Sequence, residues 1–220
     1  MSEIASFLNS SPETVSTSVK LFLLLTVLSI APGILMIMTS FTRIIIVLSF
    51  VRTSLATQQM PPNQVIIGLS LFLTFFVMAP TMNQVNKEAL TPLFNDEITL
   101  EESYERAAVP FKEFMSSYTR QKDLELFLNY SGAERPQTIE DIPLTALVPA
   151  FALSELKTAF QIGFMIFIPF LVIDMVVASV LMSMGMMMLP PVMISLPFKI
   201  LLFVLVDGWY LVVKSLLQSF

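Results

Sequence analysis

The feature that most constrains this chain is the separation of its charged residues from its apolar ones. Eighteen of the 29 charged residues lie between Lys87 and Asp141, and the other eleven are scattered over the rest of the chain. Hydrophobic residues make up 55% of the sequence and its mean hydropathy is +0.78, outside the range of soluble domains. A soluble domain would carry charge on every helix. The pattern therefore predicts an integral membrane protein built from helices.

The residue types that are missing exclude several kinds of chemistry. The chain has no cysteine and no histidine, so it has no thiolate nucleophile, no Cys-type zinc site and no imidazole base. Its six glycines form neither a GxxxxGK nor a GxGxxG phosphate loop. The net charge of −5 argues against nucleic acid as a partner. We expect no enzyme activity, no metal and no cofactor.

The first 81 residues are predicted to form a polar segment and an apolar helical hairpin. Residues 1–20 are polar, and residues 21–38 are apolar around Pro32. We interpret the apolar stretch as retained, because a signal peptide would need a basic start and a cleavage site of small residues. A second apolar run, residues 65–80, is slightly short for a span of about 20 residues. The hairpin is assigned to residues 21–81.

Residues 82–145 are predicted to be an acidic, soluble helical insertion. They carry six basic and twelve acidic residues, a net charge of −6. Thr99 and Glu102 have the spacing of a capping box, which predicts the start of a helix kinked further on by Pro110. A second helix is expected to stop at Gly132.

Residues 146–220 are predicted to form a second apolar helical hairpin. Pro190 and Pro191 divide it into two helices, about 158–182 and 192–214, joined by a methionine-rich tip. The fold class is therefore an all-α membrane protein with about four apolar helical segments in kinked hairpins. The kinks are expected at Pro32, Pro169 and Pro197.

Basic residues predict the orientation in the membrane. The linker between the first two apolar units contains Arg43 and Arg52 and no acid, so it is expected on the cytoplasmic side. The N-terminus and the acidic insertion then lie outside. Two further crossings return the methionine-rich tip to the cytoplasmic side, giving four crossings.

Two carboxylates inside apolar runs are the strongest candidates for chemistry. Asp174 and Asp207 lie on the two arms of the second hairpin, where paired acids serve an intramembrane aspartyl hydrolase or a proton relay. Neither has the GxGD context of such enzymes. We favour a structural salt bridge to Lys199, Lys157 or Arg43, from the same or a neighbouring chain. A small-solute transporter is a further alternative, but no inverted repeat relates residues 21–80 to 158–214.

Two further patterns carry weaker hypotheses. Ser154 and Lys157 form an S-x-x-K pair, but the S-D-N and K-T-G elements of that enzyme class are absent, so a helix surface is the better interpretation. Methionines cluster near the tip, where they fill helix contacts or seal flexibly around chains of different shape. The cluster comprises Met182, Met184, Met186, Met187, Met188 and Met193.

Long segments of this sequence resemble the FliP family of flagellar export-apparatus proteins, to which virulence-secretion proteins of the SctR type are related. In the C-terminal half these are PAFALSELKTAFQIGF (149–164), PFLVIDMVVASVLMSMGMMMLPP (169–191) and ISLPFKILLFVLVDGW (194–209). In the N-terminal half they are SFTRIIIVLSFVR (40–52) and TQQMPPNQVIIGLSLFLTFFVMAPT (57–81). The LPPVMISLP form points to a flagellar rather than a virulence system. The acidic insertion and the first 20 residues carry little of the resemblance.

The resemblance implies a subunit of a protein-conducting export gate in the bacterial inner membrane, within the flagellar basal body. Its expected partners are further copies of itself in a pentamer, FliQ, FliR, FlhB, FlhA, membrane lipid and unfolded rod, hook and filament proteins. The resemblance also implies a pore gasket at Met186, Met187 and Met188. Salt bridges between subunits are expected from the charges within the apolar regions: Arg43, Glu155, Lys157, Asp174, Lys199 and Asp207.

Overall fold

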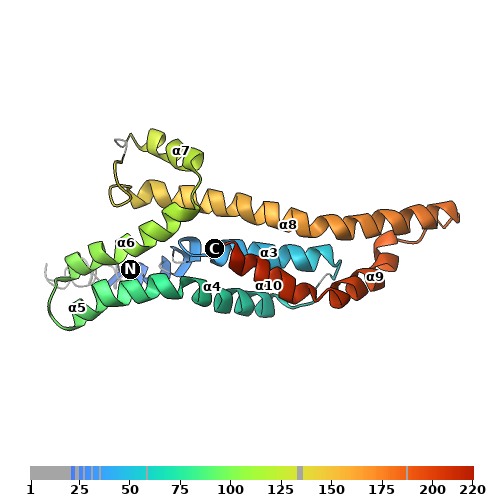
Figure 1. Cartoon of the computed structure of the whole chain (residues 1–220), viewed down its shortest axis with the longest axis horizontal. Coiled ribbons are helices and arrows are strands. Elements are labelled where there is room, and N and C mark those ends of the chain that lie inside the picture. Colours follow the sequence, from blue (N-terminus) through green and yellow to red (C-terminus); the bar gives the residue numbers. More distant parts are fainter. Residues whose placement is uncertain are drawn as a thin grey trace, which may run out of the picture. The chain divides into compact units, whose positions relative to one another are not determined.

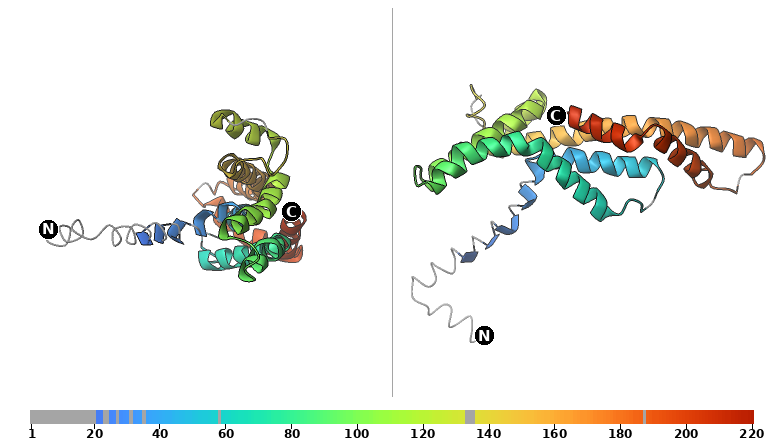
Figure 2. Two further views of the ribbon diagram at one scale, coloured as in Figure 1. Left: turned by 90° about the vertical axis from the view of Figure 1, so that its left-hand side faces the viewer. Right: turned by 60° about the horizontal axis from the view of Figure 1, so that its bottom comes forward.

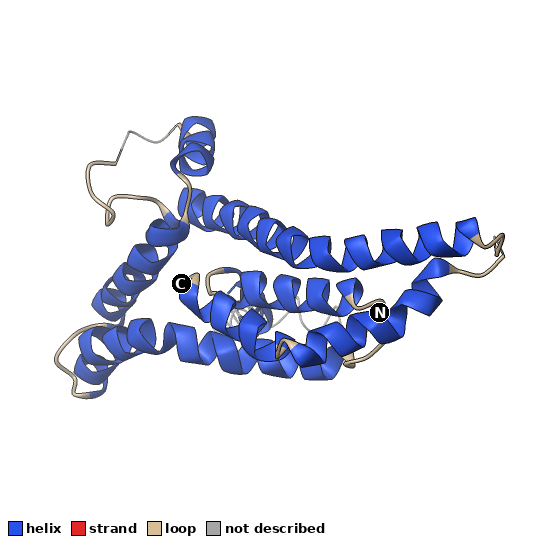
Figure 3. Cartoon of the chain, turned by 45° about the vertical axis from the view of Figure 1, so that its right-hand side comes forward, coloured by secondary structure: helices blue, strands red, loops and turns tan. Residues whose placement is uncertain are grey.

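The computed structural model describes residues 21–22, 25–26, 28–30, 32–34, 36–57, 59–132, 136–186 and 188–220. Over these ranges all regular structure is helical, which confirms the all-α fold (Figure 3). The chain divides into two compact units, Met1–Ile37 and Met38–Phe220. The polar segment 1–20 lies outside the described residues. Pro32 lies among the described helical residues of the first unit, and a kink there remains a prediction.

The core of the second unit is built around α3 (Phe41–Ser54). Buried residues recur along α3 at helical spacing, so that one broad face points inward. This face joins apolar side chains of α4, α8, α9 and α10 in the main core cluster, whose α3 members are Ile44, Val47, Leu48 and Val51. Six of the 14 residues of α3 are buried, and Arg43 is one of them, so the packing of this face fixes the position of that charge.

The second apolar run forms a longer helix than the sequence predicted. Helix α4 spans Asn63–Val85 and continues through a π-helical turn, η1 (Asn86–Leu90), into α5 (Thr91–Phe94). The boundary predicted between residues 81 and 82 falls inside this helix. The buried stripe of α4 has a spacing of about four residues and includes Ser70 and Thr74. Each hydroxyl donates to the carbonyl four residues before it, at 2.7 Å, so neither is left unpaired inside the packed helices.

The acidic insertion contains two amphipathic helices, as predicted. Helix α6 (Leu100–Tyr118) starts with the expected capping box: Glu102 N–H donates to Thr99 Oγ1, and Thr99 N–H donates to the Glu102 carboxylate. Helix α7 (Gln121–Ser131) ends at Gly132 in the left-handed conformation. Met115 of α6 packs with Ile142, Leu147 and Phe151 in a second apolar cluster, which joins the insertion to the start of α8 (Figure 1).

Helix α8 (Leu144–Ser183) is 40 residues long, which at about 1.5 Å per residue is about twice the thickness of a bilayer's hydrocarbon core. Eight of its ten buried residues lie between Ala146 and Gly163. The first half of α8 therefore packs within the protein, while the second half projects a largely exposed apolar surface. Pro149 and Pro169 lie inside this helix, and Pro197 lies inside α9. Kinks at Pro169 and Pro197 remain predictions.

The second arm of the C-terminal hairpin is broken, and its prediction as one helix over 192–214 was wrong. Helix α9 (Pro191–Leu205) and helix α10 (Gly208–Gln218) meet at an angle of 63°. At the break, Asp207 adopts φ 52°, and a side chain at Gly208 would collide with the ring of Phe203. The bend brings α10 alongside α3, as Figure 1 and the second view of Figure 2 show.

Two of the described helices are long and apolar enough to cross a membrane. These are Asn63–Phe94, of mean hydropathy 2.1, and Leu144–Ser183, of mean hydropathy 2.6. The bent pair α9–α10 is a third if it acts as one broken span. Helix α3, at 14 residues, is too short to be a span by itself. The expected four crossings include residues 21–38, only part of which the structure describes, so that number stays a prediction.

Gly163 of α8 provides a test of the α3–α8 contact. A Cβ atom at this position would lie 2.5 Å from the Phe50 ring of α3, whereas a Cβ at Gly68 of α4 would meet nothing within 4 Å. Gly163→Ala is expected to lower stability by about 1–3 kcal/mol through overpacking. Gly68→Ala, the matched control, is expected to raise stability slightly because alanine is the better helix former. Thermal unfolding in detergent measures both, and equal behaviour of the two variants would contradict the close α3–α8 contact.

Candidate functional site

Two regions of the second unit bring the predicted site residues together. The first is the tip of the α8–α9 hairpin, where Asp174 of α8 faces two residues of α9. Lys199 Nζ lies 2.6 Å from Asp174 Oδ2, and the Ser195 hydroxyl donates to Asp174 Oδ1. Ser195 and Lys199 are four residues apart, so both lie on the face of α9 that packs against α8. Both are buried, and this three-residue clamp holds the two helices together nine residues before the last residue of α8.

The loop beyond this clamp carries the predicted gasket. Gly185, with φ 74°, turns the chain out of α8, and Pro190 leads into α9. Met188 is 97% exposed and Met186 is 38% exposed, while Met187 lies outside the described residues. An exposed thioether side chain is poorly explained by packing within this chain. The structure therefore presents methionine outward at the end of a long hairpin (Figure 1).

The second region surrounds Arg43, the buried charge near the start of α3. Its guanidinium forms a two-pronged ion pair with Glu155 of α8, including Arg43 Nε–H donating to Glu155 Oε2 at 2.8 Å. Both side chains are almost fully buried, at 3% and 0% exposed. A planar guanidinium matches a carboxylate in this two-pronged geometry, which satisfies both charges away from water.

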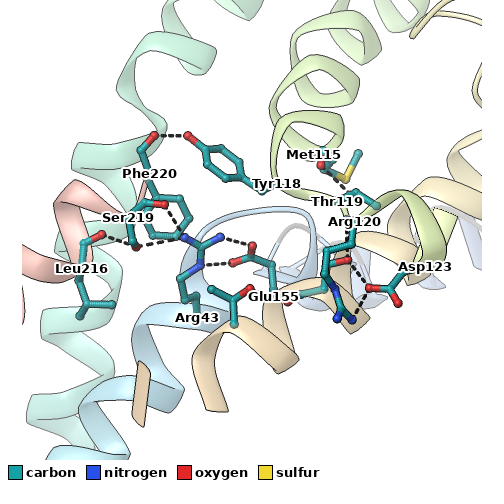
Figure 4. Close-up of polar contacts among 12 residues, drawn as sticks. Arg43, Met115, Tyr118, Thr119, Arg120, Asp123, Glu155, Leu216, Ser219 and Phe220 are labelled. Atoms are coloured by element: carbon teal, nitrogen blue, oxygen red, sulfur yellow. Dashed lines mark hydrogen bonds and ion pairs between the residues drawn. The ribbon is translucent and has the colours of Figure 1, made fainter. Parts of the chain in front are cut away.

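Another N–H group of Arg43 donates to Ser219, which follows α10. Arg43 Nη1 donates to the carbonyl oxygen of Ser219 at 2.7 Å and to its hydroxyl at 3.0 Å. The Phe220 ring lies against the guanidinium, 3.9 Å from its carbon to the ring centroid, and the Tyr118 ring lies at 5.3 Å. The Tyr118 hydroxyl donates to the Phe220 carbonyl oxygen. Arg43 therefore connects α3, α6, α8 and the residues that follow α10 (Figure 4).

A third polar junction joins α7 to α8. The Ser154 hydroxyl donates to Asp123 Oδ2 at 2.7 Å and accepts from the backbone N–H of Arg120 at 3.0 Å, and Arg120 pairs with Asp123. Ser154 is fully buried while Lys157 is exposed. The serine of the S-x-x-K pattern is thus used in packing α7, and not as a nucleophile activated by the lysine.

The structure does not bring Asp174 and Asp207 together as a catalytic pair. Asp174 is bound by Ser195 and Lys199, whereas Asp207 is exposed at the α9–α10 break, beyond the far end of α9. At about 1.5 Å per residue, α9 places residue 207 about 12 Å along the chain from Lys199. The favoured structural ion pair of Asp174 is confirmed, with Lys199 of the same chain as its partner.

Four of the six charges expected to pair therefore do so within this chain: Arg43 with Glu155, and Asp174 with Lys199. Lys157 and Asp207 are exposed and form no ion pair with another described residue. Salt bridges between subunits remain a prediction for all six.

Among the described residues, no group of three or more acids is placed to hold a metal ion.

Sequence reasoning missed several residues that complete these sites. The spacing of Ser195 and Lys199 on one face of a helix was a usable signal, because two polar residues four apart in an apolar run point to a common partner. Ser219, Phe220 and Tyr118 gave no such signal. Their contact with Arg43 depends on the bend between α9 and α10, which no pattern in the sequence predicted.

Comparison with known proteins decides the family. The model of the FliP family matches residues 24–216. The chain belongs to the FliP family. It is 76% identical over 214 residues to the flagellar biosynthetic protein FliP of Bacillus subtilis, covering 97% of each chain. It is 58% identical to the protein of that name from Pectobacterium carotovorum, over 92% of this chain and 79% of the relative. For the Aquifex aeolicus protein the identity is 53%, over 92% and 86%. In this member of the family, the matched residues include both Arg43 and the methionine-rich tip.

The Phe220 contact with Arg43 yields a stability prediction. Phe220→Ala is expected to cost about 1–3 kcal/mol, because it removes a half-buried ring and its contact with the guanidinium. In an Arg43→Met background the cost is expected to fall by about 1 kcal/mol, since the cation–π part is already gone. Phe72→Ala is the control, because Phe72 is 77% exposed. Thermal unfolding measures all four variants, and strictly additive losses would show that Phe220 does not act on Arg43.

The α7–α8 junction yields a pH prediction. Burial raises the pKa of Asp123, but the hydrogen bonds from Ser154 and Arg120, with the charge of Arg120, outweigh it and hold that pKa below its usual value. A depressed folded-state pKa gives stability that is present above the unfolded pKa of about 3.9 and is lost as pH falls through the folded value. Asp123→Asn is therefore expected to be less stable than the unaltered chain at pH 7, with the difference shrinking below about pH 4. Glu125→Gln, an exposed change on the same helix, should leave the melting curves unchanged.

Proposed function

We propose that this chain is a subunit of the apparatus that exports flagellar proteins, needed for flagellum assembly. The observation that carries this proposal is the 76% identity to a flagellar biosynthetic protein over 97% of both chains. A match of that extent includes the membrane helices, the insertion and the hairpin tip. We therefore expect the two proteins to have the same overall role. The chain acts without catalysis, through the assembly and the passage that its helices help to form.

Within that apparatus, we infer that the chain forms part of the protein-conducting gate in the inner membrane, at the basal body. Two features support this inference. The second half of α8 and most of α9 expose large apolar side chains, more than a monomer leaves open to water. The hairpin they form ends in outward-facing methionine, a flexible and polarisable side chain suited to sealing around different polypeptides.

The partners follow from the same inference. Apolar faces of α8 and α9 meet lipid, further copies of this chain in a pentamer, or the subunits FliQ, FliR, FlhB and FlhA, while unfolded flagellar proteins pass the tip. Arg43, Glu155, Asp174 and Lys199 already have partners within the chain. Their contribution to assembly is therefore to fix the shape of each subunit. Of the six charges, Lys157 and Asp207 are exposed and form no ion pair with another described residue, so they are the ones we expect first in salt bridges between subunits.

Complementation of a Bacillus subtilis strain that lacks the relative tests the proposed role in flagellar export. In a strain lacking that protein, this chain is expected to restore swimming and the release of flagellin into the medium. Glu155→Ala should abolish much of this rescue, because an unpaired buried Arg43 costs about 3–5 kcal/mol and disturbs the subunit's shape. Full rescue by Glu155→Ala, or failure of the unaltered chain to rescue although it reaches the membrane, would contradict the proposal.

Cysteine crosslinking tests the gate position, since the chain has no cysteine of its own. Met188→Cys is expected to form a disulfide with a cysteine-bearing flagellar protein stalled during export. Tyr130→Cys is the matched control, because Tyr130 is 87% exposed but lies on the acidic insertion. A crosslink from Met188→Cys alone supports the gasket. No crosslink, with the stall confirmed and export otherwise normal, would remove the methionine tip from the path of the substrate.

A further inference from the structure

The turn between α5 and α6, within the acidic insertion, carries three large apolar side chains that the described part of the chain leaves open. Phe94 at the end of α5 is 79% exposed, and Leu100 and Tyr104 in the first turns of α6 are 75% and 68% exposed. The turn lies beyond the start of α8 (Figures 1 and 2). In a segment that is otherwise polar, neither the fold nor the proposed role accounts for these side chains. Large apolar side chains gathered in one place mark an interaction surface.

Leu100 and Tyr104 extend an apolar stripe that α6 already uses for packing. At about 100° per residue, Leu100, Tyr104, Phe111 and Met115 lie within about 60° of one another around the helix. Met115 is fully buried, and Phe111 packs with it against the start of α8. The stripe therefore has a covered half and an open half. The apolar stripe of an amphipathic helix is the face that meets a partner, so the open half is a packing surface without one in this unit.

The turn is held in shape by its own hydrogen bonds. The buried Ser103 hydroxyl donates to the Ala89 carbonyl oxygen at 3.2 Å, which ties the start of α6 to η1. Glu97 N–H donates to the Pro92 carbonyl oxygen at 2.9 Å, and the capping box of Thr99 and Glu102 closes the start of α6. A partner therefore meets a surface that is already ordered, which lowers the entropic cost of binding.

Charge indicates what kind of partner fits this surface. Residues 94–105 include five acidic residues and no basic one: Asp96, Glu97, Glu101, Glu102 and Glu105. All five are exposed, and none forms an ion pair with another described residue. Glu101 and Glu105 are one turn apart and follow the edge of the stripe that holds Leu100 and Tyr104. The surface is therefore an apolar strip with a row of carboxylates beside it.

This combination argues against three other occupants. A purely apolar partner would cover the carboxylates without pairing them, which is costly. The same surface of a second copy would bring like charges together, because the insertion has a net charge of −6. An anionic lipid surface would repel the carboxylates in the same way. A polypeptide with basic residues beside apolar ones satisfies both parts of the surface.

We propose that the α5–α6 turn is a docking surface for a basic amphipathic helix of a different protein. Apolar side chains of that helix cover Phe94, Leu100 and Tyr104, and its Lys or Arg residues pair with Glu101 and Glu105. Helices of this kind bind through apolar residues three or four apart. The surface goes beyond the gate role, since it uses no residue of the methionine tip.

Photo-crosslinking in living cells tests this surface. The full chain, with p-benzoylphenylalanine in place of Tyr104, is expressed in the Bacillus subtilis strain that lacks the relative, and the crosslinked peptide is sequenced by mass spectrometry. The replacement keeps an aromatic ring at this position. The expected product is a segment of a different protein with Lys or Arg beside apolar residues three or four apart. Glu105→Lys is expected to lower the yield about fivefold without lowering the melting temperature, because an exposed ion pair becomes a like-charge contact.

Glu125→Lys is the matched control, because Glu125 is an exposed acid on α7, and it should leave the yield unchanged. Changing the partner's basic residue nearest to the crosslink to glutamate should restore the yield with Glu105→Lys. A crosslink only to lipid, only to another copy of this chain or only to a segment without basic residues would overturn the proposal. So would no crosslink, or an equal loss of yield in Glu125→Lys.

The same cells separate this proposal from the export role. Swimming and flagellin release report on the export role, and the crosslink reports on the docking surface. Cells that swim without the crosslink would overturn the docking surface and leave the export role standing. Cells that show the crosslink and its dependence on Glu105 without swimming would have the opposite meaning.

Discussion

The buried ion pair of Arg43 and Glu155 is the interaction on which the second unit depends. An unpaired guanidinium among apolar helices would be strongly destabilising, so every element near it is placed to satisfy it. Glu155 takes one side of the guanidinium, and Ser219 and Phe220 take the other. Glu155 and Ser219 lie 112 and 176 residues from Arg43 in sequence. The ion pair therefore ties α3, α8 and the end of the chain to one arrangement, and Tyr118 adds α6 to it.

The α8–α9 hairpin is also held by an ion pair between two helices, with a different geometry. Asp174, Ser195 and Lys199 form a compact polar contact between two helices that are otherwise apolar and largely exposed. Apolar side chains pack without a strong directional preference, so the polar clamp is what fixes the register of the two helices. The clamp lies about 14 Å along α8 from the last residue of that helix, and it fixes the two arms that carry the methionine-rich tip. A polar clamp between the arms and exposed methionines in the loop suit the gasket proposed for this hairpin.

The acidic insertion is joined to the membrane helices at two places that differ in chemistry. One is the aromatic cluster of Phe114, Tyr118 and Phe220 above Arg43, and the other is the polar junction of Asp123 and Ser154. The first packs the end of α6 against Arg43 and Phe220, and the second anchors α7 on the packed half of α8. The insertion is therefore held against the long apolar helices by an aromatic contact at one place and by a polar contact at the other.

The sequence by itself determined those features of this protein that depend on composition and on local sequence pattern. The membrane character, the helical fold, the capping box at Thr99, the helix stop at Gly132 and the turn at the methionine-rich tip all follow from local pattern, because hydropathy, capping and glycine conformation act over a few residues. The pairing of Asp174 with a lysine was one of a few options that the sparse charges allowed. Only the tertiary structure decided that α4 continues to Phe94, that α9 and α10 are separate helices, and which charges meet. Arg43 finds Glu155 and Phe220 because a bent C-terminal arm returns to the start of α3, and contacts over such separations are set by packing rather than by any local sequence signal.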